Sequence, residues 1–464
     1  MITIKNVVQS VLFILATSQF CIKVAHAGIP IEHWTQASGV EVYLVQSPAI
    51  PMLDVQLDFD AGSRRDPPEQ AGLASVTAAM VSKGLRAGEP PDAPAMDENA
   101  LGEAWADLGA SFFAHASTDR MSFSLRSLTY PDLLATAVQL AARQIAEPAF
   151  PAEVWQRERD AMQASIREAN TRPATLVGRA LTQAVYGLHP YGYESTEASL
   201  QRIDVSHMAT FYRQMIQPCR ARVSLVGAVT RAQADALVTQ MLGRLVAVSG
   251  AAMPGSVTAG CKALPTVSEV QALTKASEQR IAFDSAQAHV LLGQPGFKRD
   301  DPDYFPLTVG NYILGGGGFV SRLTHEVREK RGLSYSVSSN FAPALHAGAF
   351  TLGLQTRPDQ AEQALQVARE VLAKFVADGP TDAELQAAQS NLIGGFALRL
   401  DSNRKLLDNI ANIAWNRLPL NYLDTWTERV GQVTSAAIRA AFQRKLQPQT
   451  MATVVLGGKD VVQK

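Results

Sequence analysis

The sequence predicts an α+β protein made of two homologous halves, each a largely antiparallel sheet covered by helices in an α/β-sandwich-like arrangement. Three observations support this fold class: an internal repeat, the alternation of apolar and polar residues in two strands, and an irregular segment between the halves. The chain has 464 residues, which is too many for one hydrophobic core and fits two or more domains.

The repeat is clearest near the end of each half. The segments 203–227 and 433–457 align with each other without a gap. Each copy predicts a helix that a capping residue opens, Asp204 or Thr434, and that ends near a proline. An apolar strand ending in glycine follows in both copies, so we expect the same supersecondary unit twice.

Two strands show the period of two that is typical of a sheet with one buried face. Apolar Met121, Phe123 and Leu125 alternate with polar residues in the first half. The second half repeats the alternation with Phe350, Leu352 and Leu354. We therefore expect antiparallel sheets with one face on the core and the other in solvent. Looser matches extend the repeat backwards, pairing 55–59 with 290–293 and 150–153 with 379–384.

Composition divides the chain into four segments. Residues 1–27 have the layout of a cleavable secretory signal, with Lys5, an apolar run and a final Ala25-His26-Ala27. We therefore expect an exported, periplasmic protein, with retention of this segment as an N-terminal anchor as the alternative. Residues 249–274 are rich in Ala, Gly, Pro, Ser and Thr and predict a linker. The two domains that this linker separates are expected at 28–248 and 275–464.

Charge and hydropathy exclude several classes of partner. The formal net charge is −1 with acidic and basic residues interspersed, so we expect no nucleic-acid partner. Beyond the signal, no stretch is long and apolar enough to cross a bilayer, so we expect no integral membrane association. Two cysteines remain after processing, Cys219 and Cys261. One disulfide is possible in an exported protein, but two free, buried thiols are the favoured interpretation.

The first domain carries short motifs of a known family. Residues 61–64, 72–74 and 117–119 read Ala-Gly-Ser-Arg, Gly-Leu-Ala and Ser-Thr-Asp. With a further motif in the second domain, they make the mature chain resemble the M16B branch of the pitrilysin (M16) peptidase family. The resemblance implies a zinc site made of His-x-x-Glu-His on one helix and a distant glutamate. In this chain the four positions are degenerate, being filled by Ser75, Ala78, Ala79 and Ser165.

No other residues are expected to replace the missing ligands. No two of the eight histidines lie within five residues of each other, so no helix can present two imidazoles one turn apart. His325 begins a zincin-like run, but Glu329 stands where the second histidine belongs. Glu168, three residues after Ser165, is interpreted as a solvated helix residue. We therefore expect no metal and no cofactor in this chain.

The strongest motif lies in the second domain. Residues 326–337 read Glu-Val-Arg-Glu-Lys-Arg-Gly-Leu-Ser-Tyr-Ser-Val and follow a glycine run at 315–318. The resemblance implies that the arginine and tyrosine of this motif, here Arg328 and Tyr335, reach across a closed chamber to bind a peptide substrate. A guanidinium and a phenol can hydrogen-bond a peptide carbonyl and stabilise an oxyanion. The alternatives are an ordinary surface charge and a packed strand residue. The glycines predict a backbone that bends sharply or lies against another element.

The resemblance and the lost ligands lead to two hypotheses about function. In the first, the chain is the non-zinc-binding subunit of an exported heteromeric M16B zinc metallopeptidase, inactive alone, and an HxxEH-bearing partner holds the zinc. It would contribute Arg328, Tyr335 and half of the proteolytic chamber. The alternative is a non-catalytic peptide-binding or scaffold protein, homodimeric or core-subunit-like, with no peptidase role. Retention of the Arg/Tyr pair favours the first hypothesis, because a pure scaffold would have no use for it. A hydrolase with its own nucleophile is poorly supported, because no Gly-x-Ser-x-Gly elbow and no activated cysteine context is present.

Overall fold

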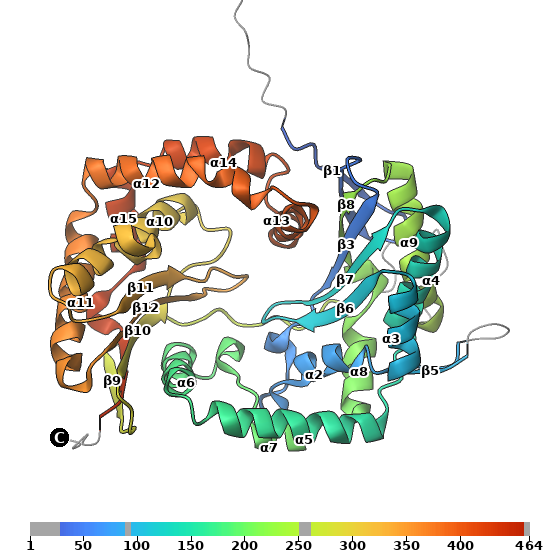
Figure 1. Cartoon of the computed structure of the whole chain (residues 1–464), viewed down its shortest axis with the longest axis horizontal. Coiled ribbons are helices and arrows are strands. Elements are labelled where there is room, and N and C mark those ends of the chain that lie inside the picture. Colours follow the sequence, from blue (N-terminus) through green and yellow to red (C-terminus); the bar gives the residue numbers. More distant parts are fainter. Residues whose placement is uncertain (1–27, 89–93, 250–260, 459–464) are drawn as a thin grey trace, which may run out of the picture.

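A computed structural model describes residues 28–88, 94–249 and 261–458. The expected signal segment, 1–27, lies outside the described residues. Figure 1 shows two α/β lobes that face each other across a central space, with both sheets turned toward that space and most helices on the outside. The predicted fold class, two halves with sheets covered by helices, is confirmed.

Each lobe is built on one main sheet. The first sheet has the order β1-β2-β8-β3-β7-β6, and the second has the order β11-β12-β10-β13-β9. The strands of the first sheet are β1 Glu32–Thr35, β2 Glu41–Gln46, β3 Met52–Phe59, β6 Ser111–Ala116, β7 Met121–Leu128 and β8 Arg222–Gly227. Those of the second are β9 Ser277–Ile281, β10 Ala288–Pro295, β11 Ser336–Phe341, β12 Ala349–Thr356 and β13 Ala452–Leu456. A small hairpin pairs β4 Gly84–Leu85 with β5 Met96–Asp97.

The α-helices follow the same division. The first half contains α2 Leu73–Met80, α3 Glu98–Asp107, α4 Pro131–Ala146, α5 Ala152–Ala169, α6 Pro173–Tyr186, α7 Glu197–Gln201, α8 Val205–Met215 and α9 Arg231–Ser249. The second contains α10 Tyr304–Asn311, α11 Ala361–Asp378, α12 Asp382–Gly394, α13 Asn403–Asn416, α14 Tyr422–Gly431 and α15 Ser435–Lys445.

The predicted repeat is present in three dimensions. Helices α5, α6 and α8 recur as α12, α13 and α15, and the starts of all three pairs are separated by the same offset as the two copies of the sequence repeat. The capping residues also act as expected. The Asp204 side chain accepts the backbone N–H of Ser206 and His207, and the Thr434 side chain accepts that of Ala437. Because these caps satisfy N–H groups that a helix leaves unpaired, they fix where α8 and α15 begin.

The sheets are largely antiparallel, as predicted, but the burial of one strand departs from the sequence prediction. One pair in each sheet is parallel, β2 with β8 and β9 with β13. The strands β7 and β12 alternate between buried and half-buried residues as predicted. In contrast, seven of the eight residues of β3 are buried, so the prediction of one solvated face is wrong for this strand. Its polar Asp54 and Asp58 pair with Arg126 and Arg120 of the neighbouring strand region, at 2.7 and 3.0 Å.

The second face of β3 is buried because the two halves exchange a helix. Helix α13, from the second half, packs on β8 and β3 of the first sheet. Helix α6, from the first half, packs on β10 and β13 of the second sheet, where Leu181 fills the space above Gly293. Val177 and Val185 of α6 join Val454 in the same apolar cluster. Each lobe therefore completes the inner face of the other, which ties the lobes together.

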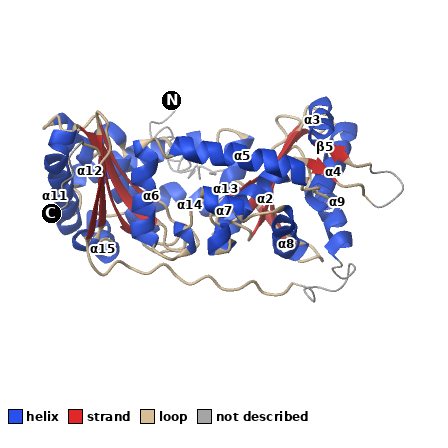
Figure 2. Ribbon diagram, turned by 90° about the horizontal axis from the view of Figure 1, so that it is seen from below, coloured by secondary structure: helices blue, strands red, loops and turns tan. Residues whose placement is uncertain are grey.

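The connection between the lobes is fastened at both ends. Residues 261–274, the described part of the expected linker, contain no helix or strand and cross from one lobe to the other in Figure 2. Near its start, Cys261 forms a disulfide with Cys219, so the preference for two free thiols is wrong. The two Cα atoms lie 6.2 Å apart, a contact between segments 42 residues apart that local sequence does not reveal. Further along, the Glu269 carboxylate accepts the backbone N–H of Ala347, at 2.9 Å.

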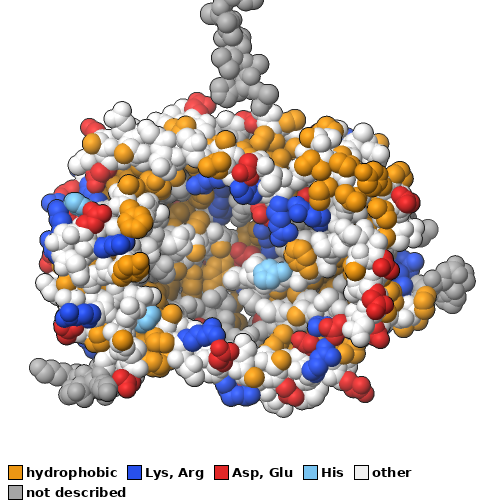
Figure 3. Space-filling model, viewed as in Figure 1, with side chains coloured by type: hydrophobic (Ala, Val, Ile, Leu, Met, Phe, Trp, Pro, Cys, Tyr) orange, Lys and Arg blue, Asp and Glu red, His pale blue; other side chains and the backbone are white. Residues whose placement is uncertain are grey.

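The lobes leave a hollow between them. In the space-filling view of Figure 3 this hollow opens toward the viewer, and Lys and Arg side chains gather along its upper rim. Among the described residues, no helix has both the length and the apolar character needed to cross a membrane.

Candidate functional site

The helix predicted to carry the degenerate zinc positions, α2, is fixed by a carboxylate. Asp66 is only 5% exposed and accepts the backbone N–H of Gly72 at 2.8 Å and of Ala74 at 2.9 Å. Gly72 has φ +105°, a backbone conformation that favours glycine and that aims both N–H groups at Asp66. An acidic group at a helix N-terminus also interacts favourably with the helix dipole. The start of α2 is thus set by Asp66 and Gly72.

The four degenerate positions have different environments. Ser75 and Ser165 are exposed, Ala79 is half-buried, and Ala78 is 2% exposed. No hydrogen bond joins Ser75 to Ser165 in the described structure. The α2 helix therefore keeps one of the four positions inside the core, where a carboxylate would be desolvated.

The acidic residues near α2 form ion pairs with lysine and arginine side chains. Lys83, just after α2, pairs with Glu98 at 2.6 Å and with Glu158 of α5 at 3.1 Å. Burial alone would lower the pKa of Lys83, but its hydrogen bonds to the two carboxylates outweigh burial and raise it. Glu168 is exposed and pairs with Arg172, in agreement with its interpretation as a solvated residue. Across the described residues, no group of three or more His, Cys, Asp or Glu side chains is arranged to hold a metal ion.

The second-half motif forms a cluster at the surface. Arg328 lies in the π-helix η7, Thr324–Glu329, and its guanidinium carbon is 4.9 Å from the centre of the Tyr335 ring. A second aromatic neighbour is Phe319, whose ring centre is 4.8 Å from the same carbon. Phe319 is 70% exposed and Tyr335 is 78% exposed, so the two rings hold Arg328 while remaining open to a ligand. We call Phe319, Arg328 and Tyr335 the aromatic–arginine cluster.

The backbone around the cluster is shaped by the glycine run. A Cβ at Gly315 would lie 2.5 Å from the backbone nitrogen of Ser339 in β11, and Gly318 has φ +61°. Both parts of the prediction are confirmed: Gly315 lies against another element and Gly318 bends the chain. The turn carries Phe319 to the cluster. Sequence reasoning missed Phe319, although an aromatic residue directly after four glycines at a bend was the available signal.

Acidic and basic neighbours of Arg328 pair with each other. Glu326 lies 2.7 Å from both Lys330 and Arg331, and hydrogen bonds from these two residues lower the pKa of Glu326 to about 2. His325 and Glu329, the pair that resembles a zincin motif, contact each other at 2.9 Å. Arg328 has no carboxylate within ion-pair distance among the described residues, so its charge remains available to a ligand.

Arg322, which lies between the glycine run and the 326–337 motif, has a structural role. It donates two hydrogen bonds to Glu384 of α12, at 2.5 and 2.6 Å, and another to the Gly379 carbonyl. Burial by itself raises the pKa of Glu384, but the hydrogen bonds from Arg322 and Thr381 outweigh burial and lower it to about 2. This pair fixes η7 to the start of α12.

The structure thus separates the two sets of predicted residues. The degenerate positions lie on α2 and α5 of the first half, and the aromatic–arginine cluster lies in the second half. No hydrogen bond, ion pair or ring contact joins the two sets in the part of the chain that the structure describes. The fold and these sites define a two-lobed α+β protein in which the described residues form no metal-ligating group and a half-buried arginine lies beside an exposed tyrosine on the second lobe.

Comparison with known proteins identifies the family. The model of the insulinase-type peptidase M16 domain matches residues 41–198, and the model of the peptidase M16 inactive domain matches residues 202–392. The crystal structure of a peptidase M16 inactive domain from Pseudomonas fluorescens is 32% identical, with a TM-score of 0.84 over 94% of this chain and 99% of that one. The chain belongs to the peptidase M16 family.

Two curated relatives carry contrasting names. An uncharacterized zinc protease of Mycobacterium leprae is 26% identical over 91% of this chain and 90% of its own length. A protein of Helicobacter pylori named non-peptidase homolog YmxG is 24% identical over 90% of this chain and 92% of its own length. The similarity extends over nearly the whole of each protein, so both domains of the fold are shared.

Proposed function

We propose that this chain is the non-zinc-binding subunit of an exported heteromeric M16B zinc metallopeptidase. In this role it contributes the Arg328 and Tyr335 side chains for peptide binding and half of the chamber wall. The partner subunit supplies the His-x-x-Glu-His motif, the distant glutamate and the zinc ion. The export rests on the layout of residues 1–27.

One observation carries the proposal: Arg328 lies beside two exposed rings, with its guanidinium carbon 4.8 and 4.9 Å from their centres, and has no carboxylate partner among the described residues, while Ser75, Ala78, Ala79 and Ser165 offer no zinc ligand set. Serine is a poor zinc ligand and alanine has no donor atom, whereas hydrolysis requires about three protein ligands and a base. A guanidinium and a phenol do not activate water on their own. They bind a peptide carbonyl and stabilise the oxyanion formed when another group activates water.

Residues of this chain position the guanidinium of Arg328 and the hydroxyl of Tyr335 as hydrogen-bond donors. The π-helix η7 positions the guanidinium, the rings of Phe319 and Tyr335 restrict its orientation, and the Tyr335 hydroxyl supplies a second donor beside it. Pre-positioned donors of this kind avoid reorganisation during the reaction. The zinc of the partner would supply the activated water.

Reconstitution tests the proposal. The purified mature chain should contain well below one zinc ion per molecule, measured by elemental analysis, and should cleave no peptide in a quenched-fluorophore library. Mixed with a co-exported M16 subunit that bears an intact His-x-x-Glu-His, it should form a stable complex on gel filtration whose cleavage exceeds that of either subunit. A complex that forms but gains no activity would support the scaffold alternative and overturn the subunit role.

A further inference from the structure

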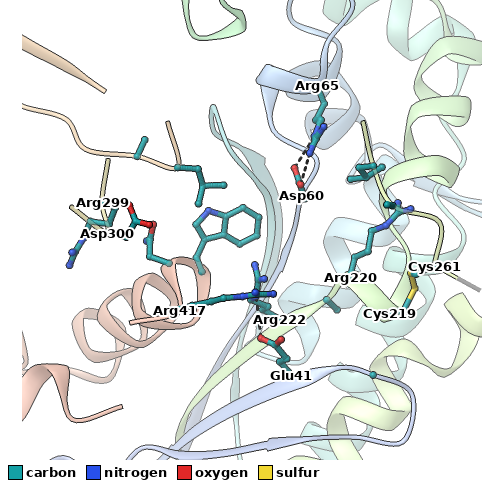
Figure 4. A pocket seen from close by; sticks show the side chains of 18 of the residues that line it. Glu41, Asp60, Arg65, Cys219, Arg220, Arg222, Cys261, Arg299, Asp300 and Arg417 are labelled. Atoms are coloured by element: carbon teal, nitrogen blue, oxygen red, sulfur yellow. Dashed lines mark hydrogen bonds and ion pairs between the residues drawn. A yellow bond between two sulfur atoms is a disulfide. The ribbon is translucent and has the colours of Figure 1, made fainter. Parts of the chain in front are cut away.

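A cavity of about 760 Å³ lies between the two halves, beside the end of α13 (Figure 4). Its wall is formed by the first sheet, by the linker just after the disulfide, and by the second half. Figure 4 shows Arg222 and Arg417 on neighbouring parts of the wall, with the Arg65–Asp60 pair and the Cys219–Cys261 bond further along it. The volume is in the range of small-molecule and short-peptide sites. No residue of the aromatic–arginine cluster lines it.

The lining carries an excess of positive charge. Six cationic side chains face three anionic ones: Arg65, Arg220, Arg222, Lys262, Arg299 and Arg417 against Glu41, Asp60 and Asp300. The first two carboxylates are already paired, Asp60 with Arg65 at 2.7 Å and Glu41 with Arg222 at 3.3 Å. The other four cations differ in whether protein groups already occupy them.

One of the remaining cations is structural. Arg299 is 7% exposed, donates to the Tyr422 hydroxyl at 2.8 Å and lies 3.8 Å from the Tyr304 ring centre. A second cation, Arg220, donates hydrogen bonds to the carbonyls of Gln214 and Lys262. In contrast, the side chains of Lys262 and Arg417 have no carboxylate within ion-pair distance among the described residues, and Asp300 has no cation there. Two uncommitted cations and one carboxylate remain, which suits a ligand with a single negative charge better than a polyanion.

Arg417 has an unusual backbone for its residue type. It ends α13 with φ +51° and ψ +41°, the left-handed conformation in which glycine or asparagine is the common choice. Its counterpart in the first copy of the repeat is Gly187, which ends α6 with φ +55°. The two positions share a positive φ but differ in ψ. An arginine where the first half has glycine, with an exposed guanidinium free of ion pairs to the described residues, indicates a role for the side chain.

Trp415 contributes an unpaired buried donor to the cavity wall. Its side chain is 6% exposed and lines the cavity, yet the buried indole N–H has no hydrogen-bond acceptor in the described structure. The indoles of Trp34, Trp105 and Trp155 each donate to an oxygen. The guanidinium carbon of Arg222 lies 5.2 Å from the centre of the Trp415 ring, which keeps positive charge next to the unused donor. Buried polar groups are nearly always paired with protein groups or ordered water, so this donor is available to an acceptor at the cavity wall.

From these observations we infer that the cavity beside α13 is a carboxylate-binding site that takes the acidic end of a short peptide, with Arg417 and Lys262 as the cationic contacts. A carboxylate is planar, carries one charge and accepts hydrogen bonds from a guanidinium fork. The same chemistry could be presented by a free small carboxylic acid, which the experiment below distinguishes. The site belongs to this chain alone, so its test does not depend on the proposed zinc-bearing partner.

The test uses the purified mature chain with its disulfide intact. Calorimetric titration compares N-acetyl-Ala-Ala-Ala, whose only charge is its free C-terminal carboxylate and which we call the acidic peptide, with the matched N-acetyl-Ala-Ala-Ala amide, which has none. The acidic peptide should bind at least tenfold more tightly, and its affinity should fall as salt rises from 50 to 500 mM because the pairing is electrostatic. Binding of both peptides with equal affinity, or no binding of the acidic peptide at 10 mM, would overturn the inference.

Variants assign the binding to this cavity. Arg417→Gly removes the guanidinium while suiting the positive φ, so the variant should fold and should bind the acidic peptide at least tenfold more weakly. Arg404→Ala, on the same helix but outside the cavity lining, removes the same charge and should bind within twofold of the wild type. Unchanged affinity in Arg417→Gly would contradict the assignment.

A third arm distinguishes the source of the carboxylate. Propionate that competes with the acidic peptide but binds at least tenfold more weakly supports a peptide site. Propionate that binds as tightly as the peptide rejects the peptide and leaves a small-acid site. In a ¹⁵N-tryptophan sample, the indole resonance that disappears in Trp415→Phe should shift when the acidic peptide is added. A resonance that does not move would contradict the role of Trp415 as a donor.

Discussion

The two halves use the same part of their shared repeat in opposite ways. In the first half, the segment between β3 and β6 contains α2, a regular helix whose Ala78 is buried. In the second half, the segment between β10 and β11 contains a glycine bend and η7, which hold Phe319 and Tyr335 in solvent. The second connection also contains a regular helix, α10, with Phe305 and Leu307 buried, so the halves differ in the segment that follows this helix. This contrast shows that two copies of one scaffold can present different side chains at the surface.

The largest expected effect concerns the second half, where Arg328 and Tyr335 lie at the surface. In a reconstituted complex with a zinc-bearing partner, Arg328→Ala should lower kcat/KM by about 10²–10³-fold, because it removes a donor to the oxyanion. Tyr335→Phe should give a smaller loss in the same peptide-cleavage assay. Arg331→Ala is the matched control, since Arg331 is three residues away and pairs with Glu326. Full activity in both Arg328→Ala and Tyr335→Phe would remove their assigned role.

The next prediction tests whether Ala78 of α2 is packed too tightly in the core to be replaced by a carboxylate. Ala78→Glu should lower the free energy of unfolding by about 2–4 kcal/mol, because the new carboxylate would be buried without a partner. Urea denaturation followed by circular dichroism measures this change. Ser75→His, at an exposed position on the same helix, should stay within about 0.5 kcal/mol of the wild type. Equal stability of Ala78→Glu and the wild type would show that the helix still has room for a metal-site carboxylate.

A third prediction concerns what holds α2 in place. Asp66→Ala should cost about 1–2 kcal/mol in the same denaturation experiment, because the N–H groups of Gly72 and Ala74 lose their acceptor. The comparable residue before α10, Asp303, makes no side-chain capping bond and pairs with the exposed Arg444. Asp303→Ala should therefore change stability by less than Asp66→Ala. The reverse order would contradict the capping role of Asp66.

The smallest expected effect is the pH dependence of stability that Glu384 of the second half provides. The pKa of Glu384 is lowered to about 2 in the folded protein, so the unfolded state binds a proton first as pH falls. The stability that the ionised Glu384 provides is fully present above about pH 5 and is lost as pH falls from 4.5 toward 2. The stability difference between wild type and Glu384→Gln should be about 1 kcal/mol at pH 7 and shrink over this window in urea titrations. A difference independent of pH would contradict the lowered pKa.

Much of the fold could be predicted from local sequence. Alternation in β7 and β12 and the caps at Asp204 and Thr434 depend on residues within a few positions of each other, and the structure confirms them. The single solvated face expected for both sheets was wrong for β3, because the helix that covers β3 comes from the other half of the chain. Periodicity reports whether a face is buried only when the covering element is known.

The candidate sites also combine features that the sequence shows with features that only the folded chain shows. The absence of zinc ligands at Ser75, Ala78, Ala79 and Ser165 is a matter of residue chemistry and is visible in the printed sequence. Residue chemistry alone does not show that Phe319 contacts Arg328 or that Arg417 and Trp415 meet the linker at one cavity. These contacts depend on bends in the backbone and on the exchange of helices.

By itself, the sequence determined the repeat, the caps, the strand pattern and the lost ligand set, because each follows from residue type and short-range spacing. Only the tertiary structure decided which helix covers which sheet, that Cys219 bonds Cys261, and which side chains surround Arg328. Such contacts join residues that are distant along the chain. They are selected by the shape and burial of complete elements, and no local pattern encodes them.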